Sequence, residues 1–578
     1  MKKHIVLFCL SALLSLFAFG CGSDSEDSES DSLTGVSISG RGKVKTGKTA
    51  TLKAVPTKTG NPSITYTWSI SAGETGSTLD KTDGESVTVS AGATTGTVTI
   101  GLSAKATIDG AEKTVEAENF TIEVTEAETI SASDTPTGYA ASGSYYSGTN
   151  TITINASDSD AASTLKTYAK KGNYVIYING MIDMTYNGTY GGSMLPSAWN
   201  DDNSALGKVI AAKTDNTYSS WSAWRSAYAK ACDSTSHKTT GTYTKKSTSA
   251  LKSGTNDSTL DGYQTNLVSA WKSQIQIPLA SNTTLIGLTD ESGIKGGTIS
   301  ISGVSNIVLR NLHLQDAFDP FPHHEYNDGW NAEYDSITIQ NTNSYIWIDH
   351  CTFEDTISVG WTNFAGVNIG SVGSGGETQA YSTSNSSYEM WQTYDGLCDI
   401  KGKSANITVS YCLFQNHDKT MLIGSSDDEF GEGNTVSDSG RTITLHHNKF
   451  YGCVQRLPMA RLSYIHNFNN YYGVNSSNGY DQKAAVNARY GVYINSEYNY
   501  FDSGLKYSYN SSDSTAHLYY ANDAGAKASS TSLSSLTSST TTPVFTVPYD
   551  YNDYLDAASD VPSIVEENAG AGICTVVQ

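Results

Sequence analysis

Four acidic residues stand directly before, or at the start of, two short runs of alternating apolar residues. Glu333 and Asp335 precede SITI, and Asp395 and Asp399 lie in DGLCDIK. If the two runs are neighbouring strands, their starts stack and the carboxylates gather along one wall. Calcium favours such clusters, since it takes six to eight oxygen ligands. The pattern therefore predicts a calcium site, although acids at these positions also cap turns.

Three basic residues follow on later runs of the same kind. Lys419 lies in HDKTMLI, and Arg456 and Arg461 lie in QRLPMAR. A cationic row beside an acidic row suits an anionic polymer that a metal ion bridges to the protein. The alternative is that these three residues only neutralise the nearby aspartates.

The composition limits the partners of such a site. The chain has 578 residues, with 36 Lys and Arg against 58 Asp and Glu, so its formal charge is −22. A protein that binds DNA or RNA neutralises phosphates with a basic face, so we expect no nucleic-acid partner. Aromatic residues make up 10% of the chain and include 36 Tyr, which argues against a disordered acidic chain.

The elements that would position these residues recur along the chain. Each repeat has apolar residues two apart, two polar positions, one special position, and an aromatic residue or Leu two positions further on. The four clearest repeats are NIVLRNLHLQD (306–316), YIWIDHCTFED (345–355), NITVSYCLFQN (406–416) and TITLHHNKFYG (442–452). Short strands at this spacing, without a long helical period, are typical of a solenoid.

The special position of the repeat becomes Asn in the later copies. It reads Asn448, Asn470 and Asn499, with a shortest spacing of 22 residues. Stacked parallel strands bring equivalent side chains to about 4.8 Å, so we expect an asparagine ladder inside one turn. An antiparallel sandwich is the alternative, but the two-residue turns of tight hairpins are scarce here. We predict an all-β protein whose main domain, residues 128–578, is a right-handed parallel β-helix.

The N-terminus reads as an export signal. Lys2 and Lys3 precede an apolar run that ends in Ala-Phe-Gly before Cys21, and eleven residues with five acids and no base follow. Small residues before a cysteine resemble the bacterial lipoprotein processing signal. We therefore expect a signal peptide over 1–20, a lipid on Cys21, and an extended acidic tether over 21–32.

A small domain separates the tether from the repeats. Residues 33–127 contain period-two runs such as TATLKAV, SITYTWSI and TGTVTIGL, with Gly, Asn and Asp between them. This pattern predicts an immunoglobulin-like β-sandwich with Trp68 in its core. A spacer role fits its few aromatic residues better than a carbohydrate-binding module does. The cysteines after Cys21 form no CxxC pair, so we expect no zinc or iron–sulfur site.

Several segments together resemble the pectate lyase family, in its polysaccharide lyase family 1 form. They are DAFDPFP, EYDSITI, YIWIDHCTF, DGLCDIKGKSANITVSYCLFQNHDKTMLIGSSD, ITLHHNKFYGCVQRLPMAR and IHNFNNYY, in this order, between about residues 140 and 510. The resemblance implies a calcium-dependent lyase that cleaves α-1,4-linked galacturonan. Two positions depart from the family pattern: Met459, where Arg is usual, and Asn467, where an apolar residue is usual.

The resemblance also implies roles for individual residues. Asp335, Asp395 and Asp399 fall at calcium-ligand positions, with Glu333 as a less certain fourth. Arg456 falls at the catalytic base, and the remaining two basic residues named above, Lys419 and Arg461, fall at positions that bind substrate carboxylates.

The chemistry of the reaction fits these residue types. Elimination removes the C5 proton of a galacturonate, and cationic groups stabilise the charge that develops on its carboxylate. Because a guanidinium ordinarily keeps its proton, we expect an alkaline optimum. Pectin lyase, a hydrolase on the same solenoid, and a non-catalytic surface protein that binds pectic polysaccharide are the alternatives. We expect a monomer, exported and lipid-anchored at the bacterial cell surface or outer membrane.

Overall fold

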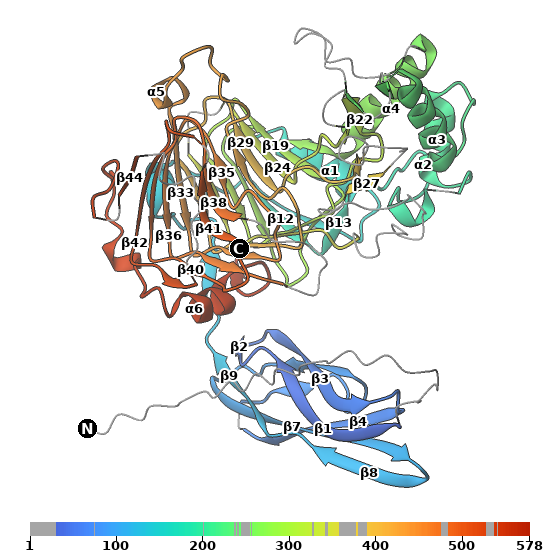
Figure 1. The fold of residues 1–578 in the computed structure, drawn as a ribbon, viewed down its shortest axis with the longest axis vertical. Coiled ribbons are helices and arrows are strands. Elements are labelled where there is room, and N and C mark those ends of the chain that lie inside the picture. The colour runs from blue at the N-terminus through green and yellow to red at the C-terminus, as the bar shows by residue number, and fades with distance from the viewer. Residues whose placement is uncertain are drawn as a thin grey trace, which may run out of the picture. The chain divides into compact units, whose positions relative to one another are not determined.

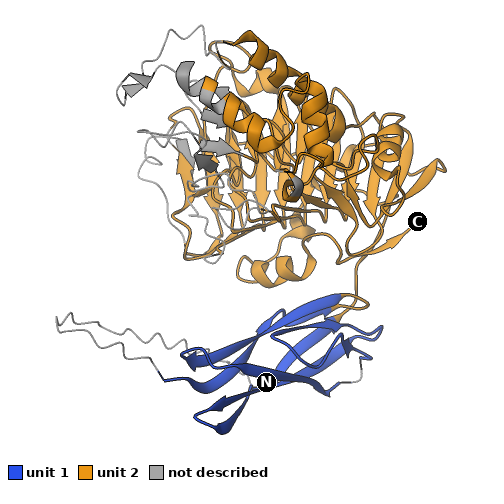
Figure 2. Cartoon of the chain, turned by 90° about the vertical axis from the view of Figure 1, so that its right-hand side faces the viewer, with its two compact units in different colours: residues 1–44, 49–124 blue, residues 45–48, 125–578 orange. Residues whose placement is uncertain are grey.

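The computed structural model divides the chain into two compact units, coloured separately in Figure 2: residues 1–44 and 49–124, and residues 45–48 and 125–578. The signal peptide, Cys21 and most of the acidic tether lie outside the residues that the structure describes, as does most of segment 356–394. The described residues are 30–73, 75–199, 201–235, 238–239, 242–243, 255, 257–325, 329–341, 345–357, 377–379, 390–475, 484–511, 513–526, 537–539 and 541–578.

The first unit is a β-sandwich of two antiparallel sheets. Alternation of buried and exposed residues along the strands gives each sheet one apolar face, as along β3. One sheet has the order β1 (Ser32–Gly40), β3 (Thr49–Thr59), β6 (Ser86–Ser90), β5 (Thr78–Leu79). The other has the order β2 (Lys43–Lys45), β9 (Phe120–Thr125), β7 (Gly96–Ile108), β4 (Ile64–Ala72), with β8 (Ala111–Glu116) paired to β7.

Trp68 lies in the core of this sandwich, as predicted. Its side chain is buried, and its indole N–H donates to the carbonyl of Gly84 at 2.9 Å. Burying so large a ring with its one polar atom satisfied is a main source of stability for a small domain.

The second unit is built on three parallel sheets that run along a parallel β-helix, so the predicted fold class is confirmed (Figure 1). The first sheet comprises β11 (Thr151–Asn155), β12 (Tyr174–Asn179), β17 (Thr283–Gly287), β20 (Ile307–Arg310), β25 (Ile346–Asp349), β30 (Ile407–Ser410), β33 (Arg441–His446), β36 (Ser463–Phe468), β39 (Tyr493–Glu497), β42 (His517–Ala521) and β44 (Thr537–Ser539). The second comprises β13 (Met181–Asp183), β18 (Gly293–Lys295), β21 (His313–Gln315), β26 (Thr352–Glu354), β31 (Leu413–Gln415), β34 (Lys449–Tyr451), β37 (Tyr471–Gly473), β40 (Tyr500–Phe501) and β43 (Ala524–Gly525). The third comprises β16 (Gln276–Pro278), β19 (Thr298–Ser302), β24 (Ile337–Gln340), β29 (Cys398–Lys401), β32 (Leu422–Ile423), β35 (Met459–Ala460), β38 (Ala484–Ala488) and β41 (Tyr507–Ser511).

The repeat positions stack from coil to coil as the sequence predicts. The Asn448 side-chain amide donates to the Asn470 amide oxygen at 3.0 Å, and Asn470 donates to Asn499 at 3.3 Å. All three asparagines are fully buried, and the ladder also satisfies backbone N–H groups at the turn. The ladder therefore fixes the register of successive coils.

Aromatic residues two positions after the special position form a second internal stack. Phe353, Phe414, Phe450, Tyr472 and Phe501 follow one another with ring centroids 4.5–5.2 Å apart and nearly parallel planes. The Tyr472 hydroxyl is satisfied inside the core, because it donates to the Asn467 amide oxygen at 3.0 Å. This bond explains why a buried asparagine is tolerated where the family usually has an apolar residue.

Helix α1 (Ala161–Ala169) packs on the first strands of the solenoid. Ala161, Leu165 and Ala169 are buried against the core that β12 and β16 begin. A solenoid needs such a cap because its first coil has no preceding coil to cover it.

The remaining short elements are β10 (Thr129–Ser131) paired with β45 (Thr575–Val577), β14 (Lys238–Thr239) with β15 (Thr242–Tyr243), the sheet of β22 (His323–Glu325), β23 (Gly329–Asn331), β28 (Met390–Gln392) and β27 (Glu377–Gln379), and the helices α5 (Val436–Ser439) and α6 (Val561–Asn568).

A group of three helices between β13 and β16 was not predicted: α2 (Ala205–Lys213), α3 (Trp221–Thr235) and α4 (Ser258–Ile275) (Figure 1). Their buried aromatic residues form a separate core with residues that flank the third sheet, among them Phe318, Tyr334 and Tyr394. No helix among the described residues is long and apolar enough to cross a membrane.

Candidate active site

The third sheet brings the acidic and basic segments onto consecutive strands. In the order β24, β29, β32, β35, Thr338 pairs with Asp399, and Leu422 pairs with Met459. Gly396 forms a parallel bridge to Lys419, which forms another to Gln455. The predicted acids therefore lie on two adjacent coils, and the predicted bases lie on the next two.

Asp335 and Asp399 form a buried pair with Lys401 between them. The Lys401 Nζ lies 3.3 Å from Oδ2 of Asp335 and 3.3 Å from Oδ2 of Asp399. Both aspartates are 1% exposed. Asp335 also accepts from the Thr338 hydroxyl at 2.8 Å, and Asp399 accepts from the Leu422 N–H at 2.9 Å. The two carboxylates are thus held in fixed orientations.

Gly396 leaves an open position between the two carboxylates. A Cβ atom placed on Gly396 would lie 2.6 Å from Oδ1 of Asp335 and 2.6 Å from Oδ1 of Asp399. The Gly396 N–H donates to that same Asp335 oxygen at 3.0 Å. Any larger residue would crowd both oxygens, so the glycine keeps the space between the two Oδ1 atoms open.

The two aspartates have less positive charge around them than two buried carboxylates need. Burial, and then the charge of Asp399, raises the pKa of Asp335 well above its usual range. Burial likewise raises the pKa of Asp399, although the charges of Lys401 and Arg456 oppose this rise. One ammonium does not compensate two buried carboxylates, so a further cation at this place would stabilise their ionised forms.

Asp395 belongs with Asp335 and Asp399 to one group of carboxylates, called the acidic wall below. It lies next to Lys419. The Lys419 Nζ is 3.4 Å from the Asp395 carboxylate and 3.4 Å from the amide oxygen of Asn331. The His417 Nε2–H donates to the Asp395 carbonyl at 2.8 Å, and its Nδ1 lies 2.7 Å from the Asp355 carboxylate. This histidine therefore fixes the backbone of Asp395.

Glu333 faces a different partner. Its carboxylate lies 3.0 Å from Nε2 of His323, and its side chain is 42% exposed. The hydrogen bond from His323 lowers the pKa of Glu333. Glu333 is therefore near the aspartates in the chain, but its described ion pair is with His323.

Arg456 stands next to the acidic wall. Its backbone has a φ of +63°, in the left-handed region, and its charge acts on Asp399. Its Nε is buried and has no hydrogen-bond partner among the residues that the structure describes. A buried nitrogen without a hydrogen-bond partner is rare in folded proteins, and Arg456 itself is only half-buried, so its side chain is a candidate to meet a ligand.

Arg461 has its own acidic partner. Its Nε lies 2.6 Å from Oδ1 of Asp427, and its Nη1 lies 3.4 Å from the carbonyl of Gly424. Asp427 is half exposed, so a substrate carboxylate could replace it without desolvating a buried acid.

The helical group supports the acidic wall from behind. Tyr334 and Tyr394 directly precede Asp335 and Asp395, and both tyrosines are buried in the aromatic core that includes Trp271 of α4. Two of the four acids are therefore positioned by packing that no repeat pattern reveals.

The structure shows one more charged residue at the site than the sequence analysis proposed. Lys401 follows Asp399 by two positions in one strand, so alternation places both on the same face, and this signal was present in DIK.

The three aspartates are spread along the wall. Among the described residues, the ligand atoms that all lie within 4.8 Å of one another belong to a different group, Glu128, His350 and Cys574.

Known proteins share this architecture. A family model described as pectate lyase matches residues 211–574. The pectate lyase of Bacillus subtilis (strain 168) is 36% identical over 216 residues, which are 36% of this chain and 44% of that protein. The pectate trisaccharide-lyase of Thermotoga maritima is 33% identical over 204 residues, which are 35% of this chain and 43% of that protein. The matched region thus spans less than half the length of these relatives.

Solved structures agree with the sequence comparison. A pectate lyase bound to a hexasaccharide aligns with a TM-score of 0.53 at 25% identity, over 76% of this chain and 97% of that one. A pectate lyase from Acidovorax avenae subsp. citrulli aligns with a TM-score of 0.57 at 21% identity, over 78% of this chain and 98% of that one, and shows the fold alone. Because the family model covers more than half of the sequence, the chain belongs to the pectate lyase family.

Proposed function

We propose that the protein is a calcium-dependent pectate lyase, which cleaves α-1,4-linked galacturonan by elimination and releases 4,5-unsaturated oligogalacturonides. The observation that carries this proposal is the succession of strands in the third sheet. Buried Asp335 lies two residues before β24 and buried Asp399 lies on β29, while Lys419 and Arg456 lie three residues before the starts of β32 and β35. The hexasaccharide bound to a structural relative supports a polysaccharide substrate.

The donor set fits calcium. Asp335, Asp395 and Asp399 offer only hard carboxylate oxygens, and Gly396 leaves room between two of them. These three residues would hold the ion, with Glu333 as a further ligand once it leaves His323. When bound, calcium would offset the buried negative charge and draw the substrate carboxylate to the wall.

The chain's own cations then act on the substrate. Lys419 and Arg461 bind galacturonate carboxylates and stabilise the charge that develops there as the C5–H bond weakens. Lys419 is held at 9% exposure beside Asp395, so its interaction with a substrate carboxylate takes place in a largely desolvated setting.

Arg456 is the base in this scheme. Its guanidinium, in the deprotonated form, takes the C5 proton, a C4=C5 double bond forms, and the C4–O4 bond breaks. The leaving oxygen takes a proton from water, which releases the rest of the polymer. The absence of a hydrogen-bond partner for its Nε among the described residues supports this role. Since a guanidinium ordinarily stays protonated, the rate should rise toward alkaline pH.

The test is incubation with polygalacturonate, with and without a calcium chelator. We expect new ultraviolet absorbance from unsaturated uronides only when calcium is present, and its loss in Arg456→Ala. Reducing ends without absorbance would indicate a hydrolase, and binding without product would indicate a surface receptor. Activity on highly methylated pectin that resists the chelator would indicate a pectin lyase.

We also propose that the protein is exported as a monomer and anchored by a lipid on Cys21, with the immunoglobulin-like sandwich as a spacer. The apolar N-terminus that ends at that cysteine supports export and the lipid anchor. Labelling cells with a radioactive fatty acid tests it: the label should appear on the wild type and be absent from Cys21→Ser. Equal labelling of both would refute the anchor.

A further inference from the structure

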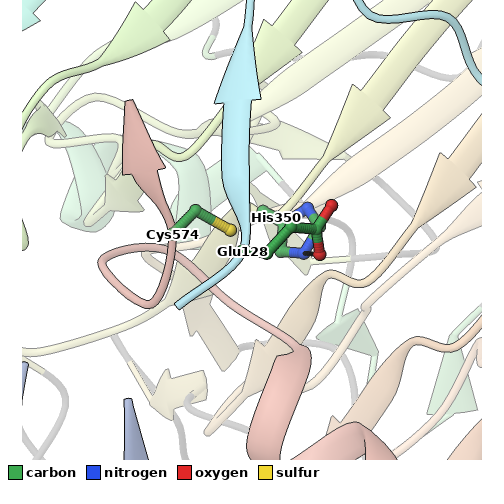
Figure 3. A group of neighbouring side chains, drawn as sticks. All are labelled: Glu128, His350 and Cys574. Atoms are coloured by element: carbon green, nitrogen blue, oxygen red, sulfur yellow. Dashed lines mark ion pairs between the residues drawn. The ribbon is translucent and has the colours of Figure 1, made fainter. Parts of the chain in front are cut away.

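A second group of potential ligands lies away from the acidic wall. Glu128 directly precedes β10, Cys574 directly precedes β45, and His350 directly follows β25. One ligand atom from each of the three residues lies within 4.8 Å of the other two. Figure 3 shows the three side chains turned toward one another from separate segments of the chain.

The imidazole of His350 is oriented by its surroundings. Its Nδ1 lies 2.7 Å from Oδ2 of Asp349, and its ring stacks on Tyr411 with centroids 5.1 Å apart and planes at 7°. Asp349 is held in turn by the Arg310 Nε at 2.9 Å and the Ser410 hydroxyl at 2.6 Å. A carboxylate on one ring nitrogen is the usual support of a metal-binding histidine, because it fixes the tautomer and the ring orientation.

The other ring nitrogen points into the group. Nε2 of His350 is buried and has no hydrogen-bond partner among the described residues, although the side chain is only 2% exposed. The nearest carboxylate to this nitrogen is that of Glu128 at 3.6 Å, beyond hydrogen-bonding distance, so an ion between the two groups would satisfy both.

The two remaining ligands are held beside it by strand pairing. Thr129 pairs with Thr575 in parallel register, and the Thr575 N–H donates to the Glu128 carbonyl at 2.7 Å. Glu128 and Cys574 therefore occupy equivalent positions on adjacent strands. The Gly572 N–H donates to Asn311 at 2.7 Å, which fastens the C-terminal segment to the solenoid.

The distances and the donor types suit zinc. Nε2 of His350 lies 3.6 Å from a carboxylate oxygen of Glu128, close to the edge of about 3.4 Å that tetrahedral zinc sets between nitrogen and oxygen ligands. A thiolate and an imidazole favour zinc over calcium. A thiolate and a carboxylate also match the double charge of the ion. A cavity of about 300 Å³, lined by Glu128 and His350, gives access and leaves room for a water ligand.

We propose that Glu128, His350 and Cys574 bind a zinc-type divalent ion, which clips β10 and β45 to the coil that carries His350. This site is independent of the acidic wall of Asp335, Asp395 and Asp399, and it takes no part in the lyase reaction. Cysteine spacing could not predict it, because the three ligands are more than 200 residues apart in the chain.

Cobalt(II) provides a direct test, since a cobalt–thiolate bond absorbs in the near ultraviolet. We expect the purified, tag-free protein, kept in excess calcium, to retain one equivalent of zinc and to give this band with cobalt. Zinc should raise Tm by a few degrees. The band should be lost in Cys574→Ser and kept in Cys453→Ser, a change of an equally buried free cysteine outside the group.

Two further variants keep the test decisive. Glu128 is exposed, so Glu128→Gln should fold normally even if Cys574→Ser does not, and it should bind cobalt at least tenfold more weakly. Asp399→Asn should leave the band unchanged. The proposal is overturned if the folded wild type gives no band, if the band survives in Cys574→Ser, or if Glu128→Gln binds cobalt as tightly as the wild type.

Discussion

Replacing Gly396 by alanine perturbs the proposed calcium wall by a single methyl group. Gly396 has a backbone conformation that other residues adopt, so the change introduces no backbone strain. The new Cβ would lie 2.6 Å from Oδ1 of Asp335 and of Asp399, whereas ordinary contacts begin at 3.4 Å. Each oxygen must therefore retreat by about 0.8 Å.

This retreat exceeds the tolerance of a calcium site. Calcium–oxygen distances vary over only about 0.3 Å, so the displaced carboxylates no longer reach one ion together. We expect calcium to bind ten- to a hundredfold more weakly, or about 1.4–2.8 kcal/mol. The crowding itself should destabilise the fold by about 1–3 kcal/mol, which leaves the protein folded at room temperature.

Calcium titration by calorimetry, together with lyase rates at a series of calcium concentrations, measures the effect. The matched control is Gly188→Ala, since a Cβ there meets nothing within 4 Å. If Gly396→Ala kept the wild-type affinity and calcium dependence while folded, calcium would bind elsewhere, and our assignment of Asp335 and Asp399 as ligands would be wrong.

Three other changes test neighbouring parts of the account. Lys401→Met should cost about 2 kcal/mol of stability in the absence of calcium, because two buried carboxylates lose their shared cation. Calcium should then raise the Tm of this variant more than it raises the Tm of the wild type. An equal rise in Tm in both proteins would contradict this prediction. Asn470→Ala should cost about 2–4 kcal/mol in urea denaturation, since the ladder loses the acceptor of Asn448, while the specific activity of folded protein stays the same; a loss below about 0.5 kcal/mol would refute the role of the ladder. Burial lowers the pKa of His446, so the stability that the neutral ring contributes to the fold is complete above about pH 6.5 and is lost as the pH falls. The drop in Tm between pH 7.5 and pH 5 should therefore be smaller in His446→Phe than in the wild type. An equal drop in both would count against this reading.

The repeat pattern was sufficient to predict the solenoid and its internal ladder. Equivalent positions in parallel coils must stack, so the special position of each repeat predicts a ladder of Asn448, Asn470 and Asn499, which the structure contains. The same logic placed Asp335 just before β24 and Asp399 on the adjacent strand β29, because each stands at the start of a repeat.

Other features depend on contacts that no local pattern contains. The helices α2–α4 belong to an insertion without repeats, so their packing behind Tyr334 and Tyr394 could not be inferred. His323 meets Glu333 because β22 pairs with β23, which ends two residues before Glu333, and this short sheet lies outside the repeats. The C-terminal strand β45 returns to pair with β10, and only this closure brings Cys574 to His350.

A crystal grown with calcium and an oligogalacturonate measures the central claim most directly. We predict one ion within about 2.3–2.6 Å of oxygens from Asp335, Asp395 and Asp399, with the Arg456 guanidinium on the C5 side of the sugar that the ion holds. An ion bound elsewhere, or an Arg456 side chain turned away from C5 in that complex, would contradict the account.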